Sequence, residues 1–336
     1  MIRVAINGYG RIGRVAHRVI LERFADQIQI VAINTGKSTD AAGWAYLLKY
    51  DTSYGILKNH IVKSEEKKLI VDGVESLLFS EKDPSLLPWK DLQVDVVIEC
   101  TGEFTTMEKV KPHLDAGAKK VVLSAPAKDS AIHTFVLDVN LTAEPTDQVI
   151  SNASCTTNCI APIAQIMVEK FGVVKAMMTT IHAYTTDQRL QDGGHKDYRR
   201  ARAAAANIVP TSTGATIAAA EAVPELKGLF TGSSIRVPVV VGSLSDFTFQ
   251  LKRPTTVEEI NTVLKEAANS LRYSHILEAS EDPLVSSDIV GNSHSAIVDL
   301  SLTQVVGGDL AKVFAWYDNE WGYANRLVEE VVLVGQ

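Results

Sequence analysis

Cys155 is the residue best suited to nucleophilic chemistry, and it lies in the segment Ser151 to Cys159, SNASCTTNC. Small and hydroxylic neighbours are typical of a helix start, where backbone N–H dipoles lower the pKa of a thiol and favour the thiolate. By itself, a cysteine there is more often a buried small residue than a nucleophile. Cys159 follows one turn later, and its C-x₃-C spacing differs from zinc and redox motifs, so we interpret Cys159 as structural.

His182 is the candidate base for that thiol. It lies in the segment Thr179 to Tyr184, TTIHAY, which has the apolar and β-branched character of a strand. An imidazole near Cys155 would form the Cys-His pair that nucleophilic catalysis requires. Spacing along the chain does not decide whether the two residues meet, and an ordinary core or surface histidine is the alternative.

Three glycines near the amino terminus, Gly8, Gly10 and Gly13, form a G-x-G-x-x-G motif. The motif follows a strand-like run, Val4 to Ile6, and opens the helical segment Ile12 to Phe24. In that setting glycines let backbone N–H groups approach a pyrophosphate at the positive end of a helix. We therefore predict a dinucleotide site here, although a tight glycine turn without a ligand has the same pattern.

The end of the next strand departs from the usual NAD signature. An Asp or Glu about 20 residues after the glycines normally binds the adenosine ribose 2′-hydroxyl. Here the strand Ile28 to Ile33 is followed by Asn34, Thr35, Gly36, Lys37 and Ser38, with no acid before Asp40. Thr35, Lys37 and Ser38 could bind a 2′-phosphate, and an ordinary polar turn is the alternative.

The surrounding elements predict two domains. The first half continues with strands at Val94 to Glu99 and Lys120 to Ser124 around a helix at Met107 to Ala116. In the second half, the sequence predicts a helix at Cys155 to Phe171 and strands at Val174 to Ala183 and Val237 to Leu251, with a polar connection at 185–210 between the strands. A capping box at Thr255 to Glu259 opens a further helix, and a terminal helix is predicted at Asn319 to Val334. We expect an α/β protein: a doubly wound Rossmann dinucleotide-binding domain, 1–153, joined by a C-terminal helix, 319–336, plus an α+β catalytic domain, 154–318, with a mostly antiparallel sheet.

Composition limits the kinds of partner and the cellular compartment that we expect for the protein. The 336 residues include 33 basic and 40 acidic side chains, a net charge of −7, which does not favour nucleic acid or an anionic membrane. There is no apolar run of the roughly 18 residues that a membrane span needs, and no signal-peptide pattern opens the chain. Three cysteines are too few for a disulfide framework. We expect a cytoplasmic protein with no membrane or nucleic-acid partner.

Several segments together resemble, in order and spacing, the signature segments of glyceraldehyde-3-phosphate dehydrogenases. They are NGYGRIGR at 7–14, LKYD at 48–51, SNASCTTNC at 151–159, HKD at 195–197, RRARAA at 199–204, NIVP at 207–210 and WYDNEWGY at 316–323. The resemblance extends nearly from end to end, and the cysteine segment alone is very specific for this family. The family also includes erythrose-4-phosphate dehydrogenase.

The resemblance implies roles for the residues. Cys155 would be the nucleophile, and His182 its base, which with the Cys155 backbone N–H would steady an oxyanion. The site for the substrate's own phosphate would comprise Thr185, Asp187 and Arg236, and the site for inorganic phosphate Ser154, Thr156, Arg200, Thr213 and Gly214. For Lys196, Arg199, Arg200 and Arg202, a solvated basic face or a subunit contact is the alternative.

The resemblance also implies a cofactor site. Asn7, Arg11, Ile12, Lys82, Thr101, Ser124 and Asn319 match family positions around the dinucleotide, with Tyr323 packing nearby. The match departs at Thr35, where many NAD-specific members carry Asp, so we expect NAD and/or NADP as the cofactor.

The implied reaction is the phosphorylating oxidation of glyceraldehyde 3-phosphate to 1,3-bisphosphoglycerate through a Cys155 thioester. Inorganic phosphate is then the second substrate, and a homotetramer is the implied assembly, in which the 185–210 connection contributes to subunit contacts. Erythrose-4-phosphate dehydrogenase, which discharges the thioester mainly to water, is one alternative. A non-catalytic Rossmann binding protein is the other, since a fold does not fix a function.

Overall fold

The computed structural model describes residues 1–36, 40–141 and 145–336. The chain forms two compact units. Unit 1 comprises Met1–Phe135, Ala143–Ala153 and Ala324–Gln336, and unit 2 comprises Val136–Thr142 and Ser154–Tyr323. In the parts of the chain so described, no helix has both the length and the apolar character needed to cross a membrane.

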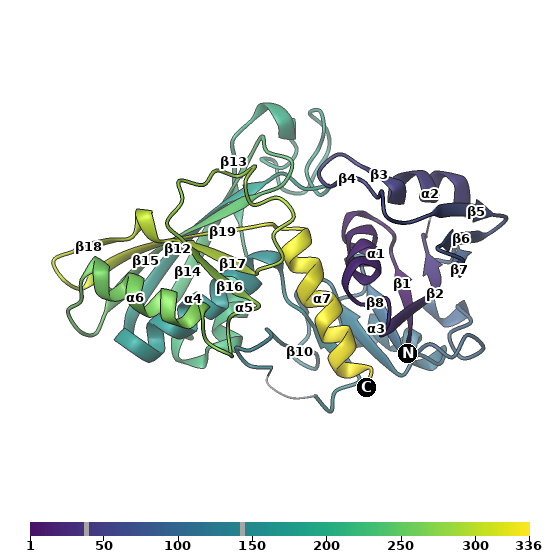
Figure 1. Cartoon of the computed structure of the whole chain (residues 1–336), viewed down its shortest axis with the longest axis horizontal. Helices are drawn as coiled ribbons and strands as arrows, with labels where there is room; N and C mark the ends of the chain where they lie inside the picture. Colours follow the sequence, from purple (N-terminus) through teal and green to yellow (C-terminus); the bar gives the residue numbers. More distant parts are fainter. Residues whose placement is uncertain (37–39, 142–144) are drawn as a thin grey trace. The chain divides into compact units, whose positions relative to one another are not determined.

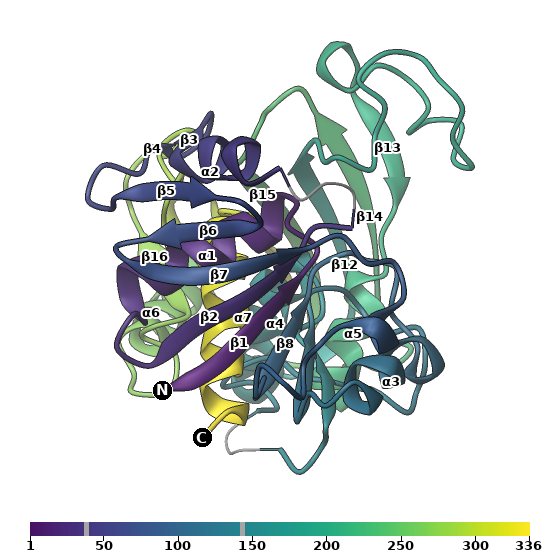
Figure 2. The ribbon, with the colours of Figure 1, turned by 90° about the vertical axis from the view of Figure 1, so that its right-hand side faces the viewer.

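Unit 1 is built on a nine-stranded sheet in the order β10-β11-β9-β8-β1-β2-β7-β6-β5. Figure 2 labels the part of this sheet from β8 through β1, β2, β7 and β6 to β5. Its strands are β1 (Ile2–Asn7), β2 (Ile28–Asn34), β5 (Val62–Glu65), β6 (Lys68–Val71), β7 (Val74–Phe79), β8 (Val96–Glu99), β9 (Lys120–Leu123), β10 (His133–Thr134) and β11 (Val149–Ser151). From β10 to β7 every neighbouring pair is parallel, and β6 and β5 add an antiparallel edge. The strand order from β7 through β2, β1, β8 and β9 to β11 is that of a Rossmann fold, with β1 in the centre.

The helices of unit 1 are α1 (Arg11–Arg23), α2 (Ala41–Lys49) and α3 (Met107–Asp115), and a short hairpin joins β3 (Tyr50–Asp51) to β4 (Gly55–Ile56). Strands such as β1 and β8 are buried almost throughout, as expected for strands covered on both faces. The expected doubly wound fold is confirmed, and each helix and strand predicted for this half lies within one or two residues of its predicted bounds.

Unit 2 contains an eight-stranded sheet in the order β13-β14-β12-β15-β19-β17-β16, with β18 paired to β19 (Figure 1). Its strands are β12 (Val173–Ala183), β13 (Val209–Ser212), β14 (Phe230–Val237), β15 (Ser243–Leu251), β16 (Leu277–Ser280), β17 (Ala296–Asp299), β18 (Gln304–Val306) and β19 (Leu310–Tyr317). Only the β12 to β14 and β16 to β17 pairings are parallel, so the predicted mostly antiparallel sheet is confirmed.

The helices of unit 2, α4 (Cys155–Phe171), α5 (Ala215–Ala222) and α6 (Val257–Ala268), share one hydrophobic core with the sheet. Burial alternates strictly along β15, so one face of that strand packs into the core and the other is more exposed. The last helix, α7 (Trp321–Val334), begins in unit 2 and continues in unit 1. Short 3₁₀ helices lie at Pro84–Leu86, Ala204–Ala206, Pro224–Leu226 and Leu300–Leu302.

One predicted strand is wrong. The run Val237 to Leu251 is broken, because β14 ends at Val237 and β15 begins at Ser243. Pro238 has no backbone N–H to donate to a neighbouring strand. Gly242 has a φ of +96°, and a Cβ there would lie 2.4 Å from the Ser286 carbonyl oxygen. A chain with both features turns at this point instead of extending.

Candidate active site

The start of α4 positions Cys155. Ser154 caps the helix, and its Oγ accepts a hydrogen bond of 3.1 Å from the backbone N–H of Thr157. The preceding residue, Ala153, has a φ of +53°, a left-handed conformation that is strained for a residue with a Cβ. The helix ends at Phe171 before Gly172, whose φ is +66°. Cys155 is therefore held, half-buried, in the first turn directly after a sharp bend.

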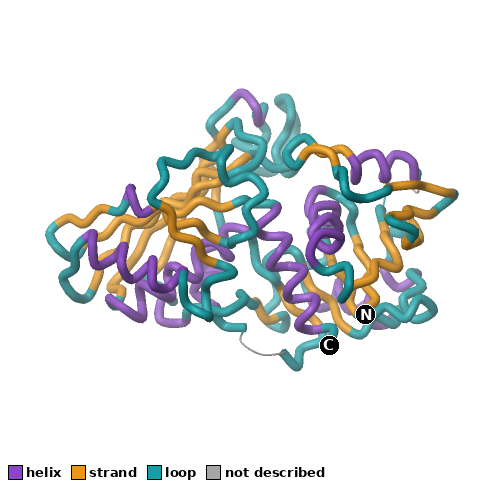
Figure 3. The backbone as a smooth tube through the Cα atoms, in the orientation of Figure 1, coloured by secondary structure: helices purple, strands orange, loops and turns teal. Residues whose placement is uncertain are grey.

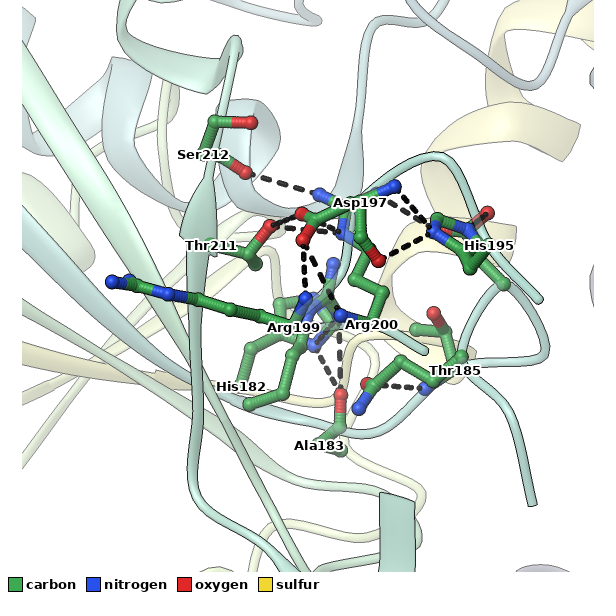
Figure 4. Close-up of polar contacts among 12 residues, drawn as sticks. His182, Ala183, Thr185, His195, Asp197, Arg199, Arg200, Thr211 and Ser212 are labelled. Atoms are coloured by element: carbon green, nitrogen blue, oxygen red, sulfur yellow. Dashed lines mark hydrogen bonds and ion pairs between the residues drawn. The ribbon is translucent and has the colours of Figure 1, made fainter. Parts of the chain in front are cut away.

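His182 lies near the end of β12, and its Nε2 is 3.4 Å from the Cys155 Sγ. Parallel pairing of β12 with β14 sets His182 opposite Arg236. The Arg236 Nη1 lies 2.5 Å from the His182 Nδ1 and donates to the Ala183 carbonyl oxygen at 3.1 Å. The His182 Nδ1 is itself 2.6 Å from that carbonyl oxygen (Figure 4). Sheet register thus brings together three side chains from α4, β12 and β14.

The pKa of the Cys155 thiol is shifted in the direction opposite to the one expected from the sequence. Burial raises the pKa of the Cys155 thiol, and the Arg236 charge and hydrogen bonds at the helix start only partly oppose it. The expected lowering of the thiol pKa is wrong, because desolvation of the sulfur outweighs the helix-start dipoles. Burial, with the Arg236 charge, lowers the pKa of His182 to about 3. The resting pair is a neutral thiol facing a neutral imidazole.

Tyr317 was given no role from the sequence, but in the structure it contacts the residue after Cys155 and the ring of His182. Its hydroxyl is 2.9 Å from the Thr156 Oγ1 and 2.8 Å from the Thr180 Oγ1, and its ring meets the His182 ring edge to face at 5.9 Å. Thr156, expected at the inorganic-phosphate site, is buried and makes its hydroxyl contact with Tyr317. The signal for Tyr317 was its place in the family-like segment 316–323.

Arg200 and Asp187, expected in separate phosphate sites, form one ion pair in the structure. The Arg200 Nη1 donates to the Asp187 Oδ2 at 2.6 Å. Its Nε donates to the Thr211 Oγ1 at 2.9 Å, and its Nη2 to the Ser212 carbonyl oxygen at 3.2 Å (Figure 4). Burial tends to raise the pKa of Asp187, but hydrogen bonds from Arg200 and His195 outweigh it and lower that pKa. Asp187 is therefore an anion that orients Arg200.

The other expected phosphate residues lie at helix starts and on the long connection. Gly214 caps α5, and the Thr213 Oγ1 accepts from the Ala215 N–H at 3.1 Å. The Thr157 Oγ1 reaches the Ala215 carbonyl oxygen at 3.5 Å, so the starts of α4 and α5 lie close together. Thr185 begins the connection between β12 and β13, which is mostly loop (Figure 3), and its N–H donates to the Gln188 Oε1 at 3.4 Å.

The expected dinucleotide residues of unit 1 follow the carboxyl ends of β1, β2, β7, β8 and β9. Gly8 has a φ of +95°, and a Cβ there would lie 2.7 Å from the Thr101 nitrogen. A Cβ on Gly13 would lie 2.3 Å from the Gly8 carbonyl oxygen, whereas Gly10, the N-cap of α1, has no atom near its Cβ position. Arg11 and Ile12 open α1, and Arg11 forms an ion pair with Asp51. Only glycines fit the two crowded positions of this turn.

The structure describes only part of the turn that follows β2. The Thr35 hydroxyl donates to the Phe79 carbonyl oxygen at 3.2 Å. Asp40, the first acid after the strand, caps α2 by accepting from the Gly43 N–H at 3.2 Å. Lys37, an expected cofactor residue, and Ser38 lie outside the described residues.

The remaining expected cofactor residues lie in both units. Lys82 follows β7 and Ser124 follows β9, and the Ser124 N–H donates to the Glu99 carbonyl oxygen at 2.9 Å. In unit 2, the Asn319 Oδ1 accepts from the Gly242 N–H at 3.1 Å and the Ser243 Oγ at 2.9 Å, and Tyr323 is buried in α7. Across residues 1–36, 40–141 and 145–336, no group of three or more His, Cys, Asp or Glu side chains could hold a metal ion.

A Rossmann unit and a second unit with a cysteine-histidine pair, carried by one chain, are typical of dinucleotide-dependent dehydrogenases. Comparison with known proteins agrees. Residues 2–107 match the family model for the NAD binding domain of glyceraldehyde 3-phosphate dehydrogenase, and residues 154–319 match that for its C-terminal domain.

Curated relatives match over the whole chain. A glyceraldehyde-3-phosphate dehydrogenase of Mycobacterium avium is 51% identical over 340 residues, which cover 100% of this chain and 99% of the relative. Relatives of that name from Streptomyces coelicolor and Zymomonas mobilis are 51% and 49% identical, over 99% and 98% of this chain and 98% and 97% of theirs. The chain belongs to the glyceraldehyde-3-phosphate dehydrogenase family of oxidoreductases.

Proposed function

We propose that this enzyme oxidises glyceraldehyde 3-phosphate through a thioester on Cys155, with NAD or NADP as the oxidant, and transfers the acyl group to inorganic phosphate to give 1,3-bisphosphoglycerate. The observation that carries the proposal is the 3.4 Å approach of the His182 Nε2 to the Cys155 Sγ, at a helix start and next to Arg236. In this proposal unit 1 binds the dinucleotide and unit 2 carries the chemistry.

The first step is addition of the thiol to the aldehyde. The Cys155 Sγ bonds to the carbonyl carbon while His182 moves the thiol proton to the carbonyl oxygen, which gives a hemithioacetal. A neutral imidazole whose Nδ1 donates to the Ala183 carbonyl leaves a lone pair on Nε2 that faces the sulfur. The Cys155 backbone N–H and His182 then stabilise negative charge on the substrate oxygen.

The second step is oxidation of the hemithioacetal. The nicotinamide dinucleotide, when bound, supplies a hydride acceptor for the carbon attached to sulfur. His182 takes the hydroxyl proton as the hydride leaves, so a thioester remains on Cys155. The glycine turn of unit 1 fits such a cofactor, because Gly8 and Gly13 admit no side chain and Gly10 leaves the start of α1 open.

The third step is attack of inorganic phosphate on the thioester, which releases the acyl phosphate and returns the thiol with a proton from His182. The neighbouring starts of α4 and α5, with Ser154 and Thr213, support an anion site there. Arg200 belongs to this site, and Asp187 orients its guanidinium. Arg236 and Thr185 would hold the substrate's own phosphate.

The cofactor choice rests on the turn after β2. Thr35 replaces the acid that selects NAD, so repulsion of a 2′-phosphate by a carboxylate is absent at the end of β2, and the next acid, Asp40, caps α2. The Thr35 hydroxyl proton points to the Phe79 carbonyl and does not favour a phosphate. We propose use of both dinucleotides.

We also propose a homotetramer in the cytoplasm. The β12 and β19 side of the unit 2 sheet exposes apolar residues such as Val174, Met177 and Leu310, 40%, 66% and 42% accessible, which favours contact with a second copy. All three cysteines are free, as in a reducing compartment. Analytical sedimentation of the wild type and of Met177→Lys tests this assembly. The lysine places a charge on the apolar surface, so the variant should dissociate more readily than the wild type.

Steady-state reduction of NAD and NADP with two aldehydes tests the function. We expect glyceraldehyde 3-phosphate to be oxidised rapidly only when phosphate is present, with 1,3-bisphosphoglycerate as the product. Faster turnover of erythrose 4-phosphate, independent of phosphate, would instead identify the erythrose-4-phosphate enzyme. Binding of a dinucleotide without oxidation of either aldehyde would identify a binding protein.

A further inference from the structure

Glu99, the last residue of β8, is a buried carboxylate that the proposed chemistry does not use. Four donors converge on it. Its Oε1 accepts from the Thr101 backbone N–H at 2.7 Å and the Thr101 hydroxyl at 2.5 Å. Its Oε2 accepts from the Asn7 Nδ2 at 2.5 Å and faces the His113 Nε2 at 3.3 Å.

The direction of the histidine contact follows from Trp89. The Trp89 indole N–H donates to the His113 Nδ1 at 3.0 Å, and an indole nitrogen is only a donor. Nδ1 therefore carries a lone pair, and the hydrogen of the neutral imidazole is on Nε2, where it points to Glu99. Trp89 and His113 are fully buried and stacked, which fixes both rings.

The network continues from Glu99 to the end of β2. The Asn34 Nδ2 donates to the Asn7 Oδ1 at 2.6 Å and to the Glu81 carbonyl oxygen at 2.8 Å, and the Asn34 Oδ1 accepts from the Glu81 N–H at 2.9 Å. Asn7 precedes the glycine turn and Asn34 precedes Thr35. One set of buried hydrogen bonds thus joins the ends of β1, β2 and β8.

The glycine turn rests on the same group of atoms. A Cβ on Gly8 would lie 2.7 Å from the Thr101 nitrogen and from the Cys100 carbonyl carbon, so the Gly8 backbone contacts the residues that Glu99 holds. The Gly8 N–H also donates to the Asn34 carbonyl oxygen at 2.8 Å. A shift of Thr101 or Asn34 would move the turn.

We propose that Glu99 is a positioning residue for the dinucleotide. Its hydrogen bonds to Thr101 and Asn7, and the bond from Asn34 to Asn7, fix the glycine turn and the turn after β2. Glu99 itself does not contact the cofactor in this proposal. This inference rests on the proposed dinucleotide site. A carboxylate accepts from all four donors, whereas a glutamine would turn its –NH₂ either toward the Thr101 backbone N–H or toward Asn7 and His113, and each orientation opposes at least one donor.

Two variants test the role. Glu99→Gln opposes at least one of the four donors. Asn34→Asp keeps the bond from the Glu81 N–H but can donate neither to Asn7 nor to the Glu81 carbonyl oxygen. We expect each to raise the Kd for NAD and NADP about tenfold or more, while kcat at saturating dinucleotide changes by no more than about twofold. Titration calorimetry gives the Kd, and urea unfolding gives the stability.

Ser76→Ala is the matched control. Ser76 is buried in β7, and its Oγ donates to the Ile30 carbonyl oxygen at 2.8 Å within the same sheet but away from the strand ends. This variant should lose stability and keep the wild-type Kd. Asn34→Asp preserves the test if Glu99→Gln does not fold.

Two results would overturn the proposal. One is a wild-type Kd in folded Glu99→Gln or Asn34→Asp. The other is a Kd that rises in Ser76→Ala in proportion to its lost stability, as in the two test variants. A wild-type protein that binds neither dinucleotide would refute the proposed function itself, and that result is seen before any variant is made.

Discussion

The lowered basicity of His182 predicts an unusual pH dependence. In the structure the imidazole is buried beside Arg236, which lowers its pKa to about 3, and its Nε2 faces the Cys155 Sγ. Protonation blocks the base, so activity is lost as the pH falls through this lowered pKa. We therefore expect the acid limb of the rate near pH 3 and not near the ordinary histidine value of about 6.5.

The size of the effect follows from the two pKa values. At pH 5, a group with a pKa of about 3 is roughly 1% protonated, whereas one of about 6.5 is roughly 97% protonated. Acidification from pH 8 to pH 5 should therefore leave the His182-dependent rate almost unchanged, where an ordinary histidine would lose about 30-fold. At the alkaline side the raised pKa of Cys155 keeps the thiol protonated beyond its usual range.

Single-turnover formation of the reduced dinucleotide measures this, because the first hydride transfer precedes the attack of phosphate. His182→Asn is the control variant, and it should be slower by about 10² to 10⁴, or roughly 2.7 to 5.5 kcal/mol, with no acid limb of its own. An acid limb near pH 6.5 in the wild type that vanishes in His182→Asn would refute the reasoning from burial. An undiminished rate in His182→Asn would remove this residue from the mechanism.

Three further substitutions test the nucleophile, the phosphate site and the cofactor site. Cys155→Ser should abolish aldehyde oxidation, and one equivalent of iodoacetamide should inactivate the wild type and label Cys155 in peptide maps; near-native oxidation by the serine variant would exclude the thioester. Arg200→Ala should raise the KM for phosphate more than that for the aldehyde, and equal effects would mean that the phosphate sites are assigned wrongly. Thr35→Asp should raise the KM for NADP about tenfold, or about 1.4 kcal/mol, without harm to NAD kinetics; absence of NADP turnover in the wild type would make this an ordinary turn.

Local sequence signals predicted helices such as α4 because the causes of these helices are local. The helix α4 has the bounds expected from its sequence, since Ser154 caps its start and Gly172 ends it. The failed strand Val237 to Leu251 contained its own counter-evidence in Pro238 and Gly242.

The site depended on information that spacing does not contain. Twenty-seven positions separate Cys155 from His182, and only the placement of β12 next to the start of α4 brings the two side chains to 3.4 Å. The direction of the Cys155 pKa shift was missed, because a helix start is visible in sequence and burial of the sulfur is not. The pairing of Arg200 with Asp187 likewise arises from the fold of the 185–210 connection.

The arrangement of charge around Cys155 favours an anionic substrate. The neutral thiol and imidazole leave Arg236 as the cation beside the sulfur. Its Nη1 lies next to the His182 Nδ1 and donates to the Ala183 carbonyl oxygen, and among the ion pairs of the described residues none joins Arg236 to a carboxylate. A half-buried cation without an anion is costly, so a phosphate group that reaches it recovers more energy than it would in water. The same positive charge would stabilise an oxyanion on the substrate. One arginine would thereby contribute both to the binding of a phosphorylated aldehyde and to the chemistry on Cys155.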